Sequence, residues 1–163
     1  MNVIFKNIPN LLTCLNLTLG LISISFSYKG NLQLGTILIF SGLFIDFFDG
    51  FFARLLSSNS EFGKQLDSLA DLVTFGIAPS TIIFQLIHYK IFNTYFFESL
   101  NIDFSTAYLA FIFPVFGAIR LAKFNLDTKQ QENFVGLPIP AAGIFLASLS
   151  FFDEKILNIN ILF

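Results

Sequence analysis

The chain has 163 residues, of which 55% are hydrophobic and 12% are charged, and its formal net charge is −2. A soluble domain carries about 25% charged residues, so this chain has too few charges to coat a water-facing surface, and we expect a lipid bilayer around it. The slight negative charge also argues against a nucleic-acid partner, because binding to phosphate backbones requires clustered Lys and Arg side chains.

Five apolar stretches follow one another along the chain, and each approaches the roughly 20 residues that a helix needs to cross a bilayer. They cover residues 11–28, 34–56, 63–89, 105–124 and 138–152. Polar segments separate them, and we predict a tight turn at 29–31 and loops at 57–61, 90–103 and 125–133. The last stretch is short, and residues 156–163 after it cannot span alone. We therefore predict one all-α integral membrane domain, 1–163, built as a bundle of five to six transmembrane helices with a shortened C-terminal helix.

Several single residues in these stretches have specific interpretations. The first stretch lacks a small-residue cleavage site, so we expect a retained helix rather than a signal peptide. Its polar residues Thr13 and Asn16 are interpreted as hydrogen-bonding between helices, with contact to a nucleotide as the alternative. Pro79 and Pro114 lie inside predicted helices and should produce local kinks. His88 is expected at the membrane interface near the other end of the third stretch.

Lys and Arg are divided unequally between the two ends of the predicted bundle. With five spans, one end holds Lys6, Arg54, Lys64, Arg120, Lys123 and Lys129, and the other holds Lys29, Lys90 and Lys155. Cytoplasmic loops carry the excess of Lys and Arg in membrane proteins. The sequence therefore predicts a multi-pass protein of the cytoplasmic membrane, with segment 57–61 and the adjoining helix ends facing the cytoplasm.

Four of the 11 acidic residues lie in the second and third stretches, as Asp46-x2-Asp49 and Asp67-x3-Asp71. At about 100° per residue, each pair lies on one stripe of its helix, beside small residues. A short loop makes the two helices antiparallel neighbours, so the two stripes can face each other and form an all-oxygen cage. Hard cations suit such ligands, and we expect two ions of Mg²⁺ or Mn²⁺ at the cytoplasmic end of these helices.

The surroundings of these carboxylates point to a phosphorylated ligand. Arg54 follows Gly50 by one helical turn, and a guanidinium beside a metal binds phosphate. An aspartate left free by the metal can accept a proton from an alcohol. The alternatives are structural ion pairs and an ion pathway, but only Arg54 and Lys64 are close in sequence, too few to neutralise four carboxylates that each cost about 2.5–3.5 kcal/mol at bilayer depth.

The run from Asp46 to Asp71 resembles the signature of the CDP-alcohol phosphatidyltransferase family, D-x2-D-G-x2-A-R-x8-G-x3-D-x3-D, at all eight fixed positions. The resemblance implies that an alcohol attacks the β-phosphorus of a CDP-linked lipid and that CMP leaves. It also implies a homodimer and six spanning helices, so the short C-terminus departs from the family pattern.

The resemblance also implies a role for each position of the motif. The four aspartates resemble the metal ligands, and Asp71 resembles the general base. The positions that resemble those binding the CDP-lipid are Gly50, Ala53, Arg54, Gly63 and Asp67.

The flanking segments resemble those of the bacterial family members that use serine as the acceptor. These segments are IPNLLTCLNLTLG (8–20), LDSLADLVTFGIAP (66–79), RLAKFN (120–125) and GLPIPAAG (136–143). The implied reaction is the transfer of a phosphatidyl group from CDP-diacylglycerol to L-serine, a step of phospholipid biosynthesis.

Candidate residues for the acceptor lie at the cytoplasmic end of the fourth stretch. Arg120 can bind the serine carboxylate with two hydrogen bonds, Lys123 follows one turn later, and Asn125 can add a hydrogen bond. For Lys123, a role in membrane topology alone is the competing interpretation. Other functions stay open as well: transfer to glycerol 3-phosphate or an inositol phosphate, a divalent-ion transporter, and a membrane scaffold without activity.

Overall fold

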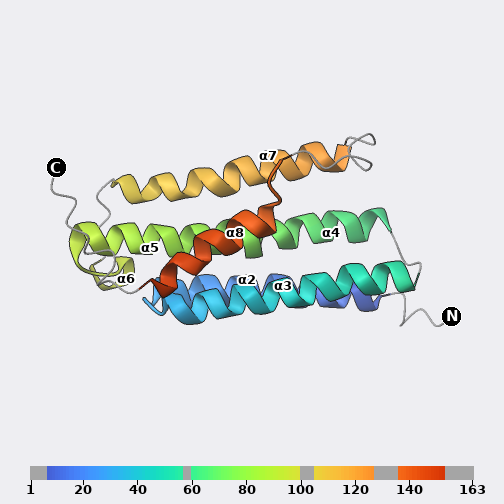
Figure 1. The fold of residues 1–163 in the computed structure, drawn as a ribbon, viewed down its shortest axis with the longest axis horizontal. Coiled ribbons are helices and arrows are strands. Elements are labelled where there is room, and N and C mark those ends of the chain that lie inside the picture. Colours follow the sequence, from blue (N-terminus) through green and yellow to red (C-terminus); the bar gives the residue numbers. More distant parts are fainter. Residues whose placement is uncertain (1–6, 57–59, 100–104, 127–135, 153–163) are drawn as a thin grey trace.

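The computed structural model describes residues 7–56, 60–99, 105–126 and 136–152, and within these ranges the chain is helical and contains no strand (Figure 1). In chain order the α-helices are α2 (Ile8–Tyr28), α3 (Leu32–Leu55), α4 (Glu61–Asp71), α5 (Ala78–Phe92), α6 (Phe96–Ser99), α7 (Ile112–Leu126) and α8 (Ile139–Ser148). Three segments have other helical geometry: the π-helix η1 (Leu72–Ile77) and the 3₁₀ helices η2 (Thr106–Phe111) and η4 (Leu149–Phe151).

Among the described residues, four helical runs are long and apolar enough to cross a membrane, namely Ile8–Tyr28, Leu32–Leu55, Glu61–Phe92 and Thr106–Leu126. A fifth apolar run, Ile139–Phe151, is shorter. Many large apolar side chains point outward, as expected for a surface that meets lipid; Phe44, for example, is 66% exposed. The five predicted stretches are thus confirmed as helices, with ends that differ by at most three residues. Residues 156–163, predicted too short to span, lie outside the described residues.

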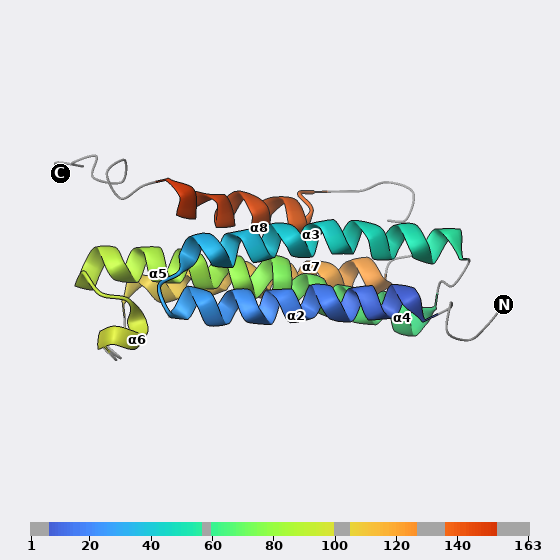
Figure 2. The ribbon, with the colours of Figure 1, turned by 90° about the horizontal axis from the view of Figure 1, so that it is seen from below.

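Each long helix runs antiparallel to the one before it in the chain, and several helix ends gather at one end of the bundle (Figures 1 and 2). The end of α3, the start of α4 and the end of α7 lie together there, on the side of the N-terminus (Figures 1 and 2). Helix α4 begins at a capped end, since the Ser60 hydroxyl accepts a hydrogen bond of 2.9 Å from the Gly63 amide. The junction of α3 and α4 therefore forms one end of the molecule.

The run from α4 to α5 changes its geometry in the middle. The π-helix η1 begins directly after Asp71 and ends two residues before Pro79. Pro79 has no amide hydrogen, so the Phe75 carbonyl lacks its α-helical donor. The Ser80 and Thr81 hydroxyls donate to carbonyls of the preceding turn, at 2.9 and 3.0 Å. A π-helix therefore directly precedes the position where the sequence predicts a local kink.

A similar change of geometry precedes Pro114. The 3₁₀ helix η2 runs from Thr106 to Phe111, and the regular helix α7 begins at Ile112. Both predicted prolines therefore follow a turn that is not α-helical.

The short helix α8 crosses the bundle obliquely, over α3 and α5 (Figures 1 and 2). It packs closely because Gly143 has no side chain: a Cβ there would collide with the Phe75 carbonyl oxygen and lie 2.9 Å from the carbonyl carbon. The apolar core under α8 includes Ile39, Ile82 and Ala147. Helix α8 thus covers the part of the α4–α5 run that departs from α-helical geometry.

Two local predictions differ from the structure. Residues 90–103 were predicted as a loop, but α5 continues to Phe92 and the short helix α6 follows. His88 was expected at the membrane interface, but its side chain is buried inside the protein, and its Nδ1 is 2.9 Å from the Thr94 carbonyl oxygen. In both cases tertiary contacts of α5 outweigh the polarity of the sequence. Residues 57–59 of the predicted loop 57–61 lie outside the described part of the chain.

Candidate active site

Three of the four predicted aspartates meet at the junction of α3 and α4. Asp46, Asp49 and Asp67 each offer one carboxylate oxygen, and these oxygens all lie within 4.8 Å of one another. Asp49 is buried, while Asp46 and Asp67 are partly buried. The facing stripes inferred from helical periodicity are therefore present in the structure.

Asp71 lies next to this group, one turn deeper along α4. Its carboxyl group is close enough to that of Asp46 for the two to interact electrostatically. Its Oδ1 atom is buried and has no hydrogen-bond partner among the described residues. A buried carboxylate oxygen without a donor is costly, so this atom calls for a cation or a proton-bearing group.

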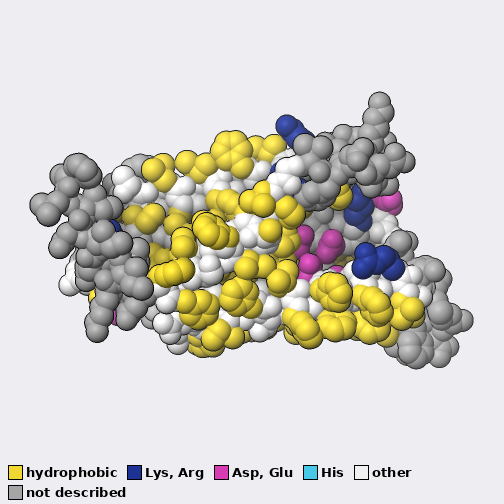
Figure 3. Space-filling view, in the orientation of Figure 1, with side chains coloured by type: hydrophobic (Ala, Val, Ile, Leu, Met, Phe, Trp, Pro, Cys, Tyr) yellow, Lys and Arg dark blue, Asp and Glu magenta, His cyan; other side chains and the backbone are white. Residues whose placement is uncertain are grey.

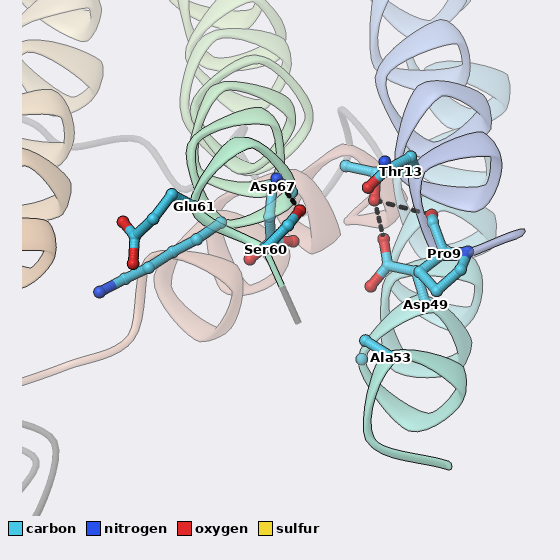
Figure 4. Close-up of a pocket in the computed structure, with 11 residues that line it drawn as sticks. Pro9, Thr13, Asp49, Ala53, Ser60, Glu61 and Asp67 are labelled. Carbon is cyan, nitrogen blue, oxygen red and sulfur yellow. Dashed lines mark hydrogen bonds between the residues drawn. The ribbon is translucent and has the colours of Figure 1, made fainter. Parts of the chain in front are cut away.

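Helix α2 contributes two side chains that contact the carboxylates. The Thr13 hydroxyl donates to Asp49 Oδ2 at 2.8 Å, with the Pro9 carbonyl oxygen as a second acceptor at 3.0 Å, and the Asn16 amide donates to Asp46 Oδ1 at 3.4 Å. Figure 4 shows Thr13 directed at Asp49, with Asp67 on the opposite helix. Sequence reasoning assigned Thr13 and Asn16 to contacts between helices and missed that their partners are the motif aspartates.

A cavity of about 540 Å³ opens beside the carboxylates. It is lined by α2 (Pro9, Asn10 and Thr13), by α3 (Asp49, Gly50 and Ala53) and by the start of α4 with its cap (Ser60, Glu61, Gly63, Lys64 and Asp67). Figure 3 shows acidic side chains in a hollow of the surface, with Lys or Arg side chains and apolar side chains nearby. Carboxylates, a cation and apolar surface thus meet where a ligand with a charged head and an apolar tail can bind.

Two glycines on the cavity wall differ in the space around them. A Cβ at Gly50 would have no neighbouring atom within 4 Å, although alanine suits a helix interior better than glycine by about 0.8–1.0 kcal/mol. A Cβ at Gly63 would lie 3.0 Å from Asn10 Oδ1 and 3.1 Å from Ser60 Oγ. Close packing therefore accounts for Gly63, whereas Gly50 leaves open space in the cavity.

The two basic side chains of the motif region, Arg54 and Lys64, are not placed as the sequence predicted. Arg54 is exposed on the last turn of α3 and is not among the side chains that line the cavity. Lys64 does line it, and its Nζ lies 5.9 Å from the centre of the Phe124 ring. Lys64 was considered only as a counter-ion, and the signal for a larger role was its place three residues before Asp67, on the same face of α4.

The three predicted acceptor residues are spread along the end of α7. Arg120 is partly buried, and a Cβ at Gly136 would lie 4.0 Å from its Nε. Lys123 is exposed. The Asn125 amide nitrogen donates to Ser68 Oγ at 2.9 Å and to Gln65 Oε1 at 3.3 Å, so both of its hydrogens are used on α4. Only the Oδ1 of Asn125, which is buried and has no partner among the described residues, is left for another group.

The donor set fits a hard divalent cation. Three carboxylate oxygens converge, a fourth carboxylate has an oxygen without a donor, and the described residues around them offer no sulfur or imidazole ligand. All-oxygen sets of this kind suit Mg²⁺ or Mn²⁺. Asp46, Asp49 and Asp67 would hold the ion, with Asp71 adjoining, and a bound ion would withdraw charge from a phosphate beside it.

Comparison with known proteins gives a consistent result. A family model described as CDP-alcohol phosphatidyltransferase matches residues 6–162. A CDP-diacylglycerol–serine O-phosphatidyltransferase of Bacillus subtilis is 38% identical over 92% of this chain and 78% of its own length. One from Helicobacter pylori strain J99 is 37% identical over 90% of this chain and 58% of its own length.

An archaeal relative has a different name. It is an archaetidylserine synthase of Methanothermobacter thermautotrophicus, which is 34% identical over 88% of this chain. The chain spans 58% of the length of this relative, as it does for the Helicobacter protein. No solved structure shows a significant match.

Proposed function

The chain belongs to the CDP-alcohol phosphatidyltransferase family, and on this premise we propose that it transfers a phosphatidyl group from CDP-diacylglycerol to L-serine, giving phosphatidylserine and CMP. The observation that carries the proposal is the convergence of Asp46, Asp49 and Asp67 beside an open cavity. The names of three relatives, two serine phosphatidyltransferases and an archaetidylserine synthase, support serine as the acceptor.

Each residue of the site has a role in this reaction. A divalent cation held by the aspartates would neutralise the pyrophosphate of the CDP-lipid. The serine hydroxyl oxygen attacks the β-phosphorus, Asp71 receives the hydroxyl proton, and the bond from phosphorus to CMP breaks with its electrons on CMP. The unpartnered Oδ1 of Asp71 supports this assignment, because it can accept a proton or a donor without breaking an existing bond.

The CDP-lipid is assigned to the cavity. Gly50 and Ala53 on α3, with Gly63 and Asp67 on α4, form its wall. Lys64 adds a positive charge to that wall, and the exposed Arg54 can reach a phosphate only by turning toward the cavity. The open space at Gly50 supports binding of the nucleotide there.

Serine is assigned to the region between the site and the start of α8. Arg120, partly buried on α7, would bind the carboxylate. The Oδ1 of Asn125 can accept a hydrogen bond from the ammonium group, while Lys123 is exposed and fits a role in topology as well.

We also propose that the site faces the cytoplasm, as the distribution of Lys and Arg predicts, and that the enzyme is a homodimer, as the family resemblance implies. Accessibility of single introduced cysteines to a membrane-impermeant reagent tests the orientation. Light scattering of the purified protein in detergent tests the dimer.

The experiment that tests the function is an acceptor comparison. Purified protein receives CDP-diacylglycerol and labelled L-serine, glycerol 3-phosphate or inositol phosphate, with Mg²⁺ or Mn²⁺ titrated, and both CMP and the labelled lipid are measured. We expect labelled phosphatidylserine and equal amounts of CMP only with metal present, and neither product with Asp67→Asn. Labelled lipid formed only with another acceptor would refute serine as the acceptor. Transport of the metal ion without any release of CMP would refute the assignment as an enzyme.

A further inference from the structure

We propose that α2 carries positioning residues for the carboxylate site: Thr13 orients Asp49 and Asn16 orients Asp46, so that both carboxylates are set for the cation before it binds. The inference rests on the proposed function, because it concerns the same aspartates. Neither Thr13 nor Asn16 belongs to the aspartate motif, and both are polar side chains buried in the bundle, with 4% and 0% of their surface exposed.

The two hydrogen bonds have the chemistry of an outer shell around metal ligands. Each donor is neutral and binds one oxygen of a carboxylate, Oδ2 of Asp49 or Oδ1 of Asp46, so the second oxygen stays outside that bond. A neutral donor fixes the rotation of the carboxylate without adding a charge that would compete with the cation. Hydrogen-bond partners that orient metal ligands in this way commonly change metal affinity by about 10- to 100-fold.

The pairing follows from the register of α2 against α3. Thr13 and Asp49 lie at equal distances along the chain from Asn31, and so do Asn16 and Asp46. The close contact between Asn16 and Gly42 lies in the next turn of the same seam. A tight turn at residues 29–31 joins the two helices and fixes this antiparallel register. Thr13 and Asn16 are three residues apart, and so are Asp46 and Asp49. The antiparallel register therefore sets each donor opposite one carboxylate.

Close backbone contacts hold α2 in this position. A Cβ at Gly42 would lie 2.8 Å from Asn16 Oδ1, and one at Gly20 would lie 2.9 Å from the Thr74 Cα. The Thr74 hydroxyl also donates to the Asn16 backbone carbonyl at 3.1 Å. Because small residues allow the helices to approach this closely, residue 16 has little freedom to move away from Asp46.

A role only in holding helices together explains the arrangement less well. The Asn16 Oδ1 is buried and has no hydrogen-bond partner among the described residues. The observed orientation of the side-chain amide therefore leaves one of its own polar atoms without a hydrogen bond. Its orientation instead gives the donor to Asp46. Asn16 is therefore oriented toward the carboxylate at a cost to its own hydrogen bonding.

The test measures metal binding without substrates. Thr13→Val removes the hydroxyl at nearly constant size, Thr13→Ser keeps it, and Asn16→Leu removes the second donor. Thr18→Val is the matched control, because Thr18 is an exposed residue of the same helix whose hydroxyl bonds to the Cys14 carbonyl at 2.8 Å. Mn²⁺ binding to each purified, monodisperse variant is followed by the electron paramagnetic resonance of free Mn²⁺, and CMP release is measured against Mg²⁺ concentration.

We expect Thr13→Val and Asn16→Leu to raise the Mn²⁺ Kd about 10- to 100-fold and to shift the Mg²⁺ dependence of CMP release by a similar factor. Thr13→Ser and Thr18→Val should stay within about threefold of the original protein. If Thr13→Val does not purify folded, Thr13→Ala takes its place with the same expectation.

Unchanged Mn²⁺ affinity in both donor-free variants would overturn the inference, even if their thermal stability falls, because a purely structural role predicts that result. Failure of the unmodified protein to bind Mn²⁺ or release CMP would instead overturn the proposed function, and the inference with it. The two failures are therefore distinguishable.

Discussion

Replacing Gly50 by alanine should stabilise the helix and weaken binding of the CDP-lipid at the same time. Gly50 lies in the interior of α3, and a Cβ added there would meet no atom within 4 Å. Alanine is favoured over glycine in a helix interior by about 0.8–1.0 kcal/mol, and no clash offsets this gain. For a chain of this size, 1 kcal/mol corresponds to a rise of about 2–4 °C in Tm.

The same methyl group would occupy space that we assign to the ligand. Gly50 lines the cavity of about 540 Å³ beside Asp49. Adding a methyl group to a packed interface costs about 1–3 kcal/mol, and each 1.4 kcal/mol is a factor of ten. The KM for CDP-diacylglycerol should therefore rise about 5- to 140-fold, while the KM for serine changes little.

Two measurements on one preparation check this prediction. Thermal unfolding in detergent is followed by circular dichroism, since the chain has no Trp for fluorescence. CMP release gives the KM for each substrate. An unchanged KM for CDP-diacylglycerol would show that the space at Gly50 does not belong to the nucleotide, and a lower Tm would show that the helix needs glycine for its own packing.

Three further substitutions test other parts of the structure. Gly143→Ala should lower the free energy of unfolding by about 1–3 kcal/mol, measured by the same thermal unfolding, because the new Cβ would collide with the Phe75 backbone; an unchanged Tm would contradict the close packing of α8. Asp71→Asn should slow CMP release by about 10²- to 10⁴-fold while the dichroism spectrum is retained, and turnover like that of the unmodified protein would exclude Asp71 as the base. Arg120→Ala should raise the KM for serine far more than that for CDP-diacylglycerol, and equal changes in the two would remove Arg120 from the acceptor site.

The spans and the aspartate stripes could be predicted because both depend on local properties. A predicted helix at 34–56 and the observed α3, Leu32–Leu55, differ by two residues at most, since apolar length alone defines such a helix. The convergence of Asp46, Asp49 and Asp67 needed only helical periodicity and a short loop. The π-helix η1 was not predicted; the sequence indicated only a local kink at Pro79.

The partners of Thr13 and Asn16 were missed because they depend on how two helices are aligned. The alignment was nevertheless available in the sequence: a three-residue turn, 29–31, joins two apolar stretches and brings residues at equal distances from it side by side. Asn125 was harder to predict. Its amide hydrogens are taken by Ser68 and Gln65, and only the packing of α7 on α4 reveals this.

The short helix α8 has a function in the bundle that its length does not suggest. Pro79 leaves the Phe75 carbonyl without its α-helical donor, and a polar backbone group facing lipid costs several kcal/mol. Gly143 brings the α8 backbone directly over this carbonyl, which keeps lipid away from it. Because η1 begins directly after Asp71, α8 packs on the segment that follows this carboxylate in the chain. A helix shorter than the four candidate spans therefore supports the segment that adjoins the site.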